Sequence, residues 1–593
     1  MAKIQVLPDA LVNQIAAGEV IERPASVVKE LVENALDAGA TRVSVDVENG
    51  GISRIAVEDD GSGMSPEDAL VALERHATSK IRVFDDLSRI ASLGFRGEAL
   101  PSIASVSRLV LTTSPDGSGL GTEVVAERGA APRSLPARHP KGTRVVVEEL
   151  FANVPARRKF LKARHAETRA VVKAVTSLAL ARPDVAFRLS AEGEVLLDFP
   201  AARDAAGRFL EVLSSASADE VVPVAHQVGG TAIRGVVTRP TTSFASRATQ
   251  WFFVNGRLAK DATVFHAATL AARDVLRVER HPAWALFLTC DPAQVDVNVH
   301  PQKLEVRFRD PGAVHAVVHR GLRDALSGGG GATALSPERS LSAPVPAFSG
   351  ASKEPRVASS VAEALGLYDR PAGLQALLPP PAVSRSRASW SDARAVSPVG
   401  PLRLLGQYRD SFLVAEGEDG IVLVDQHVAH ERVRYERILP RLEQGGNPSQ
   451  TLLIPVTYEA TAEEAVLLEE SDALLVDAGF AISSLSGRRF VVSGAPADCP
   501  GGAVEPFLRE LLARLAVRED AGGDPLAARR QALAASLACR GAVTVNTPMR
   551  SEEATRLLAD LSACRDPFTC PHGRPILLTL EHGELVRRFG RSS

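Results

Sequence analysis

This sequence has few cysteines and a net charge close to zero. The 593 residues include five cysteines, which is an odd and sparse set. Such a set argues against a disulfide framework and favours a reducing compartment. The 68 basic and 71 acidic residues nearly cancel, leaving a net charge of −3. Because overall charge supplies no attraction for nucleic acid, binding to DNA would require local basic patches.

Long apolar runs are also missing. No stretch reaches the ~20 consecutive apolar residues that a membrane-spanning helix needs, and the first residues lack the apolar core of a signal peptide. We therefore expect a cytoplasmic protein. Apolar residues still make up 45% of the chain. Since a single core rarely grows past roughly 250–300 residues, this length predicts two or three domains.

Composition divides the chain into segments. From residues 327–331 to about Gly400 the sequence is rich in Pro, Ser, Ala and Gly. Such a stretch cannot bury enough apolar surface to offset chain entropy, so residues 328–400 are predicted to be a flexible linker. About 73 residues of this kind have an r.m.s. span of roughly 45–50 Å. A second break near Phe199 separates residues 1–200 from 201–327, and residues 401–593 follow the linker.

Hydrophobic periodicity predicts alternating helices and strands, as in α/β domains. A helix over 27–38 is expected, with Ser26 as its N-cap. Strands are expected over 43–48 and 52–58, joined by a turn at 49–51, and over 251–254, 285–288 and 420–424.

Polar side chains follow one face of the helix predicted at 27–38. Glu30, Asn34 and Asp37 are spaced i, i+4 and i+7, so they share that face. A polar stripe on an apolar helix is ordinarily a solvated surface. This stripe also holds a carboxylate that could act as a base and an amide oxygen that could reach a metal ion.

Three glycine-containing motifs follow in order. In residues 59–64, an aspartate and two glycines let the backbone approach a flat ligand closely, although many such turns are only turns. Residues 94–100 begin with glycine and run into a helical pattern, where backbone N–H groups favour phosphate. Lys141-Gly142-Thr143 precedes a strand over 144–147. The sequence contains no Walker A loop.

Together, in this order, the four motifs resemble the GHKL ATPases, which include gyrase B, chaperones and histidine kinases. Residues 15–24, 75–80 and 153–161 resemble the MutL family of DNA mismatch-repair proteins in particular. The resemblance covers residues 1–327. It implies a GHKL (Bergerat) ATPase sandwich with an antiparallel sheet layered against helices, followed by an S5-like α/β transducer domain.

The resemblance also implies roles for residues at the nucleotide site, with ATP and magnesium as cofactors. Glu30 would activate water, Asn34 would hold magnesium and Asp59 would bond the adenine amino group. Lys303, in the segment 300–308, would contact the γ-phosphate and couple nucleotide state to domain orientation. The other implied nucleotide contacts are Asp37, Gly61, Gly63, Thr78, Lys80, Gly94, Phe95, Arg96, Gly97 and Thr143.

A basic run offers the clearest contact to double-stranded DNA. Arg157, Arg158 and Lys159 are followed by Lys162 and Arg164. Charge runs are usually solvated faces. A DNA contact here would involve phosphates, without sequence readout, and would be sensitive to salt. The resemblance further implies a MutS-type partner, closure of an N-terminal dimer on ATP binding, and a nucleoid-associated location.

Beyond the linker, residues 425–436 resemble the D-Q-H-A-x-x-E-x-x-x-x-E motif of DNA-nicking family members, with Val428 in place of alanine. His427 and Glu431 are four apart, so both could face one metal at a helix start. Glu436 is five residues further, which turns it away and favours a supporting role. The resemblance makes Asp425 and Glu431 catalytic, Asp425 as a ligand of the catalytic ion.

Cys539, Cys570 and His572 resemble the remaining motifs of the nicking type. Soft ligands suit zinc, whereas carboxylates suit magnesium or manganese. Two ions would support phosphodiester hydrolysis. The alternative is an ATP-driven matchmaker whose structural zinc only stabilises the fold. The family resemblance implies an α+β C-terminal domain that forms a homodimer and carries the metal-dependent endonuclease site.

Residues 450–455 resemble the short motif with which family members dock on the replication sliding clamp. Gln450, Leu453 and Pro455 would make that contact. A buried core strand is an equally good interpretation of these six residues.

Overall fold

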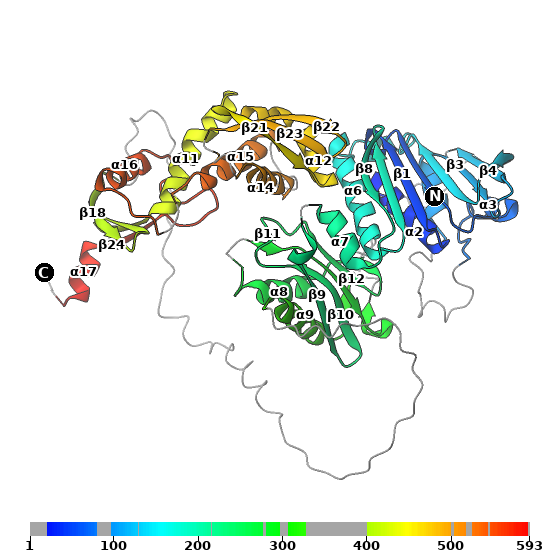
Figure 1. Cartoon of the computed structure of the whole chain (residues 1–593), viewed down its shortest axis with the longest axis horizontal. Helices are drawn as coiled ribbons and strands as arrows, with labels where there is room; N and C mark the ends of the chain where they lie inside the picture. Colours follow the sequence, from blue (N-terminus) through cyan, green and yellow to red (C-terminus); the bar gives the residue numbers. More distant parts are fainter. Residues whose placement is uncertain are drawn as a thin grey trace, which may run out of the picture. The chain divides into compact units, whose positions relative to one another are not determined.

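The computed structural model describes most of the chain outside the expected linker (Figure 1). The described residues are 21–79, 97–127, 130–214, 216–276, 280–296, 306–327, 400–497, 499, 503–517, 525–543 and 546–590. The expected linker, 328–400, therefore lies outside these residues except for Gly400. The end of helix α9 (Pro311–Leu326) coincides with the composition break near Ser327.

The first region is built on an eight-stranded sheet in the order β5-β4-β3-β6-β2-β1-β7-β8. Its neighbouring strands pair antiparallel except β1 and β7, which pair parallel. The expectation of an antiparallel sheet is thus wrong at one pair, because the long helix α6 intervenes and returns the chain in the same direction. The strands are β1 (Arg42–Glu48), β2 (Arg54–Asp59), β3 (Arg108–Ser114), β4 (Leu120–Glu127), β5 (Arg133–Arg138), β6 (Gly142–Glu148), β7 (Ala186–Ala191) and β8 (Glu194–Phe199).

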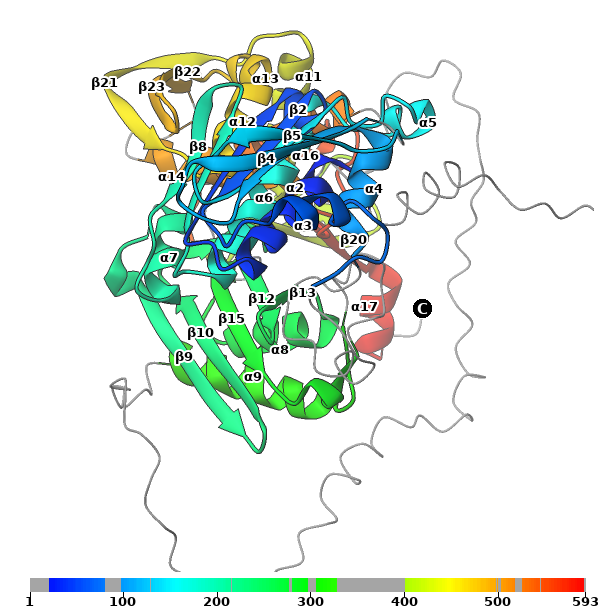
Figure 2. The same cartoon turned by 90° about the vertical axis from the view of Figure 1, so that its right-hand side faces the viewer.

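Helices α2 and α6 pack together beside this sheet (Figure 2). The helices of the region are α2 (Pro24–Asp37), α3 (Pro66–Val71), α4 (Ala99–Val106), α5 (Pro155–Arg158) and α6 (Arg164–Ala181). A 3-10 turn (Asn49–Gly51) joins β1 to β2, as the sequence indicated, although β2 begins two residues later than expected.

Helix α2 begins earlier than its sequence pattern predicted. Pro24 occupies the first turn and Arg23 is the N-cap, without a side-chain cap. Ser26 lies inside the helix, so its assignment as N-cap is wrong: proline's fixed φ suits the first turn. The helix ends in a Schellman motif, in which Gly39 (φ 74°) donates to the Leu36 carbonyl and Ala40 to that of Ala35. Both ends are therefore set by local backbone chemistry.

A second region contains a five-stranded sheet in the order β13-β12-β15-β10-β9. The two strands expected at 251–254 and 285–288 are confirmed as β12 and β15, which are parallel neighbours with almost wholly buried side chains. The elements are α7 (Ala205–Leu213), β9 (Val221–Val228), β10 (Thr231–Thr238), β11 (Ser243–Phe244), β12 (Gln250–Val254), β13 (Arg257–Ala259), α8 (Ala262–Ala272), β14 (His281–Pro282), β15 (Trp284–Thr289), β16 (Val295–Asp296), β17 (Arg307–Phe308) and α9.

The region after Gly400 has two sheets, β18-β19-β20-β24 and β21-β23-β22, all of whose pairs are antiparallel. The strands are β18 (Arg403–Tyr408), β19 (Phe412–Gly417), β20 (Gly420–Asp425), β21 (Ser449–Glu459), β22 (Ala481–Ser486), β23 (Arg489–Pro496) and β24 (Leu577–Glu581). The helices are α11 (Gln426–Glu443), α12 (Ala462–Glu470), α13 (Asp472–Asp477), α14 (Val504–Val517), α15 (Pro525–Arg540), α16 (Ser551–Ser562) and α17 (His582–Arg588).

Helix α11 joins the cores beneath these two sheets. Its first half contributes Val428 and Val433 to the core that includes β19, β20 and α16. Its second half contributes Ile438 and Leu442 to the core that includes β23, α14 and α15. Glu431 lies in the first half, between Val428 and Val433.

None of the helices within the described residues is both long and apolar enough to cross a lipid bilayer.

Candidate nucleotide and metal sites

The end of strand β2 forms a tight glycine turn packed against helix α2 and strand β3. Ser62 donates its N–H to the carbonyl of Ala38 at 2.9 Å, and Met64 donates to Thr113 Oγ1 at 3.0 Å. Gly63 has φ +64°, and a Cβ there would lie 1.9 Å from the Ser114 carbonyl oxygen. Only glycine therefore fits at this position. The turn thus forms a cradle at the end of β2 that packs tightly against the end of β3.

Asp59 presents a half-buried carboxylate at the mouth of this cradle. Its Oδ1 accepts the N–H of Gly61 at 2.8 Å, and the residue pairs with Thr143 across the β2–β6 ladder. Burial raises the pKa of Asp59 to about 6, although the Gly61 N–H and nearby His139 oppose the rise. A buried acceptor beside glycines suits the exocyclic amino group of a purine, so the residues fit the adenine that the sequence implied.

Asp60, the next residue, has a structural role that sequence reasoning missed. Its carboxylate accepts the Thr41 N–H and hydroxyl and the Arg42 N–H, at 2.7, 2.6 and 2.8 Å. Burial acts to raise the pKa of Asp60, but these bonds hold it below its ordinary value. The two adjacent aspartates thus have different roles. Asp60 fixes the start of β1, whereas the Asp59 carboxylate can still accept a hydrogen bond from a ligand.

The polar residues of α2 lie as the helical spacing predicted. Glu30 and Asn34 are half-buried and Asp37 is exposed at the last helical residue, while Val28, Leu31, Val32 and Leu36 are buried. Helix α2 packs on β2, the strand that ends in Asp59. The Glu30 carboxylate, the Asn34 amide and the Asp59 carboxylate are therefore carried by two elements in direct contact.

Two further predicted segments meet at Gly97. This residue has φ +61°, and a Cβ there would lie 2.4 Å from the Ala77 carbonyl oxygen. The segment with Thr78 therefore packs against the start of the helix-forming segment 97–100. Five expected nucleotide contacts lie outside the described residues: Lys80, Gly94, Phe95, Arg96 and Lys303.

The basic residues at 157–159 differ in their exposure to solvent. Arg157 donates to the Ile21 carbonyl at 2.6 Å and lies over the Phe151 ring, so it supports the fold. Arg158 and Lys159 are exposed and free to reach a phosphate chain. Neighbouring Phe160 is 87% exposed, which adds an apolar side chain to this surface.

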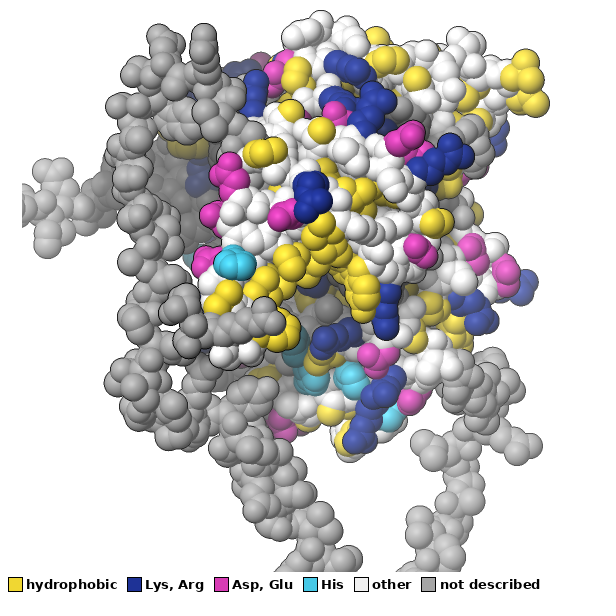
Figure 3. Space-filling view, turned by 90° about the vertical axis from the view of Figure 1, so that its left-hand side faces the viewer, with side chains coloured by type: hydrophobic (Ala, Val, Ile, Leu, Met, Phe, Trp, Pro, Cys, Tyr) yellow, Lys and Arg dark blue, Asp and Glu magenta, His cyan; other side chains and the backbone are white. Residues whose placement is uncertain are grey.

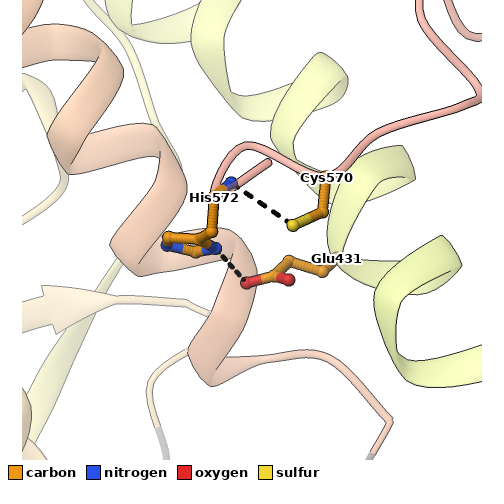
Figure 4. A group of neighbouring side chains, drawn as sticks. All are labelled: Glu431, Cys570 and His572. Atoms are coloured by element: carbon orange, nitrogen blue, oxygen red, sulfur yellow. Dashed lines mark hydrogen bonds and ion pairs between the residues drawn. The ribbon is translucent and has the colours of Figure 1, made fainter. Parts of the chain in front are cut away.

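The second site gathers residues from three distant parts of the C-terminal region. Glu431 of α11, Cys570 and His572 each offer a ligand atom, and these atoms lie within 4.8 Å of one another (Figure 4). Glu431 is buried and accepts from His572 Nδ1 at 3.1 Å. The Cys539 thiol of α15 also bonds Glu431; burial, and then this carboxylate, raise the pKa of Cys539 to about 12. The four predicted ligands Glu431, Cys539, Cys570 and His572 are thus brought together.

Asp425 and His427 stand apart from that cluster, at the start of α11. Asp425 is the N-cap, and its Oδ1 accepts the N–H groups of His427 and Val428 at 3.0 and 3.1 Å. The ring of His427 contacts the Val543 carbonyl through Nδ1 at 2.7 Å. Burial acts to raise the pKa of Glu431, but His572 above all, with Cys539 and nearby His427, holds it below its ordinary value.

Two supporting residues complete the site. Arg514 of α14 donates to His572 Nε2 at 2.9 Å, which leaves the proton of a neutral ring on Nδ1, facing Glu431. No spacing in the sequence could have indicated this contact, since the partners are 58 residues apart. Glu436 accepts the N–H groups of Arg565 and Asp566 at 2.8 and 3.2 Å. Its expected supporting role is therefore confirmed.

The segment 450–455 is not a core strand. In the β21–β23 ladder, Thr451 pairs with Gly494 and Val456 with Val492, so residues 452–455 bulge outward. Leu453 is 99% exposed and Ile454 77%. The Gln450 side chain is held by the carbonyls of Cys499 and Pro496 at 2.7 and 3.3 Å.

Family comparisons agree with this division of the chain. Residues 21–124 match the family described as "Histidine kinase-, DNA gyrase B-, and HSP90-like ATPase". Residues 209–327 match "DNA mismatch repair protein, C-terminal domain", and residues 405–549 match "MutL C terminal dimerisation domain". With its cradle and its eight-stranded sheet, the N-terminal region is thus a GHKL ATPase domain that binds ATP, followed by a transducer domain and a dimerisation domain.

Whole-chain relatives narrow the class further. The DNA mismatch repair protein MutL of Symbiobacterium thermophilum is 38% identical over 637 residues, covering 100% of both chains. Those of Desulforudis audaxviator and Anaeromyxobacter sp. (strain K) are each 40% identical, again over 100% of both chains. The chain belongs to the MutL family of DNA mismatch repair proteins.

Solved structures of single domains also match. "Aquifex aeolicus MutL ATPase domain complexed with ADP" is 30% identical, covering 46% of this chain and 94% of that one, with a TM-score of 0.35. The ATPase domain of "bacterial mismatch repair endonuclease Aquifex aeolicus MutL" is 25% identical, covering 52% and 99%, with a TM-score of 0.38.

The neighbouring aspartates Asp59 and Asp60 give opposite predictions for stability. Asp59 has a folded pKa of about 6, raised from 3.8. The folded state therefore loses stability as pH rises from about 4 to 6, and the cost persists above 6. In the nucleotide-free protein, Asp59→Asn should raise the free energy of unfolding by about 1–2 kcal/mol at pH 8, after allowance for solvent screening, and by less at pH 5.

Asp60→Asn is the matched control. Its lowered pKa contributes stability above its unfolded pKa that is lost as pH falls through the folded pKa, so this variant should be less stable than wild type at pH 8. Urea unfolding of the full chain at both pH values measures the two differences. A loss of stability in Asp59→Asn at pH 8 would contradict the account of its buried charge.

Proposed function

We propose that this chain couples mismatch recognition to strand incision: an ATP-driven clamp at its N-terminus controls a metal-dependent DNA-nicking site near its C-terminus. The observation that carries the proposal is the gathering of Glu431, Cys539, Cys570 and His572, with Glu431 on the helix that Asp425 caps. The alternative function is an ATP-driven matchmaker without nuclease activity, in which the same ligands hold only a structural zinc.

At the nucleotide site the proposed roles follow from position. Asp59 accepts from the adenine amino group, with Gly61, Gly63 and Thr143 around the base. Asn34 supplies an amide oxygen for the magnesium ion, which neutralises phosphate charge when bound. Glu30, one turn before Asn34, is placed to take the proton of an attacking water. The other proposed contacts are Asp37, Thr78, Lys80, Gly94, Phe95, Arg96, Gly97 and Lys303.

At the second site the donor set suits zinc. Thiolate and imidazole ligands from Cys539, Cys570 and His572, with the Glu431 carboxylate, match the mixture that zinc accepts. Binding requires the thiols and His572 Nδ1 to give up their protons. His427, one turn before Glu431, and the N-cap Asp425 would hold a second, looser ion of the manganese class. Such an ion activates water for phosphodiester hydrolysis.

Dimerisation through the C-terminal domain would bury the partly apolar outer face of the β18-β19-β20-β24 sheet. Leu578, Leu423 and Val414 are aligned across β24, β20 and β19, on the face opposite the buried Leu413, Val422 and Val424. Leu405 and Tyr408 of β18 and Phe412 of β19 are also 41–55% exposed. Figure 3 shows hydrophobic side chains gathered on this side of the molecule. We assign this sheet face to the partner copy, because an apolar face of this size is rarely left in water.

We assign the remaining partners to residues that are exposed on the surface. The outward bulge with Leu453 and Ile454, anchored by Gln450 and ending at Pro455, is shaped for a pocket on the replication sliding clamp. Arg158 and Lys159, with Arg157 behind them, would contact DNA phosphates without reading sequence. A MutS-type protein would supply mismatch recognition.

The proposed location and domain limits complete this picture. We place the protein in the cytoplasm, at the nucleoid. The domains are 1–200 (ATPase), 201–327 (transducer), 328–400 (linker) and 401–593 (dimerisation and nicking). These limits are supported by the end of β8 at Phe199 and the end of α9 at Leu326.

Glu30→Ala should separate ATP binding from hydrolysis. Loss of a general base is expected to lower the ATPase kcat by about 100-fold or more, while ATP affinity stays within about threefold, because Glu30 does not hold the adenine. Steady-state hydrolysis and nucleotide titration of the full chain measure the two effects. Glu22→Ala, an exposed glutamate just before α2, is the control. Equal loss of affinity and kcat would show that Glu30 only shapes the pocket.

Asp425→Asn should abolish nicking without unfolding the protein. Asparagine caps a helix as well as aspartate does, so α11 persists, but the charge that a catalytic ion needs is lost. Conversion of supercoiled plasmid to open circles with manganese should fall about 100-fold or more. Asp419→Asn, an exposed turn carboxylate, should nick like wild type.

The same plasmid assay tests the DNA contact and the alternative function. Arg158→Glu with Lys159→Glu should weaken nicking most at low salt and should make it less dependent on salt, since fewer phosphate contacts remain. If wild-type protein with bound zinc nicks no DNA at all, the matchmaker function replaces the nicking enzyme.

Single substitutions should show that the sheet face with Leu578 and the bulge with Leu453 bind different partners. Leu578→Asp should convert the dimer to a monomer in sedimentation, while clamp affinity per chain is unchanged. Leu453→Asp should leave the dimer intact and weaken clamp binding about tenfold or more. A dimer that survives Leu578→Asp, or clamp binding that survives Leu453→Asp, would remove the corresponding assignment.

A further inference from the structure

Three histidines gather on the transducer domain, far in sequence from both sites described above. His266 lies on α8, and His315 and His319 lie one turn apart on α9. Both helices have aspartate N-caps, Asp261 and Asp310, that fix where they begin. A group of histidine side chains is visible on the face drawn in Figure 3. No role in ATP binding, dimerisation or nicking uses these residues.

The helices that carry the histidines are held close together. Buried Ala267, Ala268 and Ala271 of α8 share a core with Val314 and Val317 of α9. Small residues on one helix let the axes approach, and this contact fixes the spacing of the side chains at its edge. His266 is exposed and His315 and His319 are half-buried, so the group borders solvent.

The distance between two of the three rings suits a shared ion. His266 Nδ1 lies 3.3 Å from His315 Nε2. Two nitrogens bound to a tetrahedral zinc at about 2.0–2.1 Å lie roughly 3.3–3.4 Å apart, which is the same separation. The rings of His315 and His319 are nearly parallel, at 8°, with centroids 6.0 Å apart. Two histidines spaced i, i+4 on a helix face are a recurrent chelating pair, so His319 would have to rotate from this stacked position to reach the same ion.

The environment favours the ligand form of the rings. Burial lowers the pKa of His315, and the neighbouring His266 and His319 lower it further. Neutral imidazole is the form that binds metal.

We propose that His266, His315 and His319 bind one divalent transition-metal ion of the zinc class, with a fourth position open to water. The ion ties α8 to α9, the last helix before the linker. It is distinct from the thiolate-containing cluster at Glu431, because it has nitrogen ligands only.

Metal counting on the untagged full-length chain tests the site. The protein is stripped with chelator and dialysed against zinc, and bound zinc per chain is measured. His315→Asn and His266→Asn should each bind about one zinc fewer than wild type. His582→Asn, an exposed histidine on α17, should bind as wild type does. Because His266 is exposed, its substitution should not disturb folding.

Cobalt substitution separates the two metal sites. The cluster with Cys570 gives a thiolate-to-cobalt charge-transfer band, and the three-histidine site gives none. In His315→Asn that band should persist while one cobalt is lost; in Cys570→Ser the band should vanish while the histidine site stays filled. An unchanged zinc ratio in both histidine variants, or an equal loss in His582→Asn, would overturn the proposal and leave only hydrogen-bonded surface rings.

Discussion

The C-terminal half depends on the position of one helix. Helix α11 is anchored in two hydrophobic cores, through Val428 and Val433 in one and Ile438 and Leu442 in the other. Asp425 fixes its first residue by capping it, so its rotation and its start are both set. Glu431 is therefore held at the place where the loop carrying Cys570 and His572 arrives. The ligands converge because packing determines where the helix can lie.

The two candidate sites use buried charge in different ways. Asp59 keeps one carboxylate only partly compensated, and the resulting rise of its pKa is a cost that a ligand donor can offset. At Glu431 the charge is already compensated by His572 and Cys539, which lowers its pKa despite burial. In the first arrangement the carboxylate can still accept a hydrogen bond, whereas in the second it is already bonded to two groups that carry protons.

Local patterns in the sequence predicted what depends on local chemistry. The face shared by Glu30, Asn34 and Asp37 and the strands at 251–254 and 285–288 follow from periodicity, and the family motifs indicated the ligand set. Sequence patterns did not predict the contacts between residues that are far apart in the chain. These are the parallel β1–β7 pair, the hydrogen bond from Arg514 to His572, and the bonds of Asp60 at the start of β1. The segment 450–455 was ambiguous for the same reason, since its outward course is set by its register against β23.

That register has a consequence for solubility. Strand β21 is at the edge of its sheet, where unpaired backbone groups can template another chain. The bulge at 452–455 interrupts its ladder at the point where Leu453 and Ile454 are most exposed. Apolar side chains on a flat edge would invite edge-to-edge aggregation, but a bent edge cannot continue a ladder. The irregularity that exposes these two side chains thus also hinders edge-to-edge aggregation of the protein.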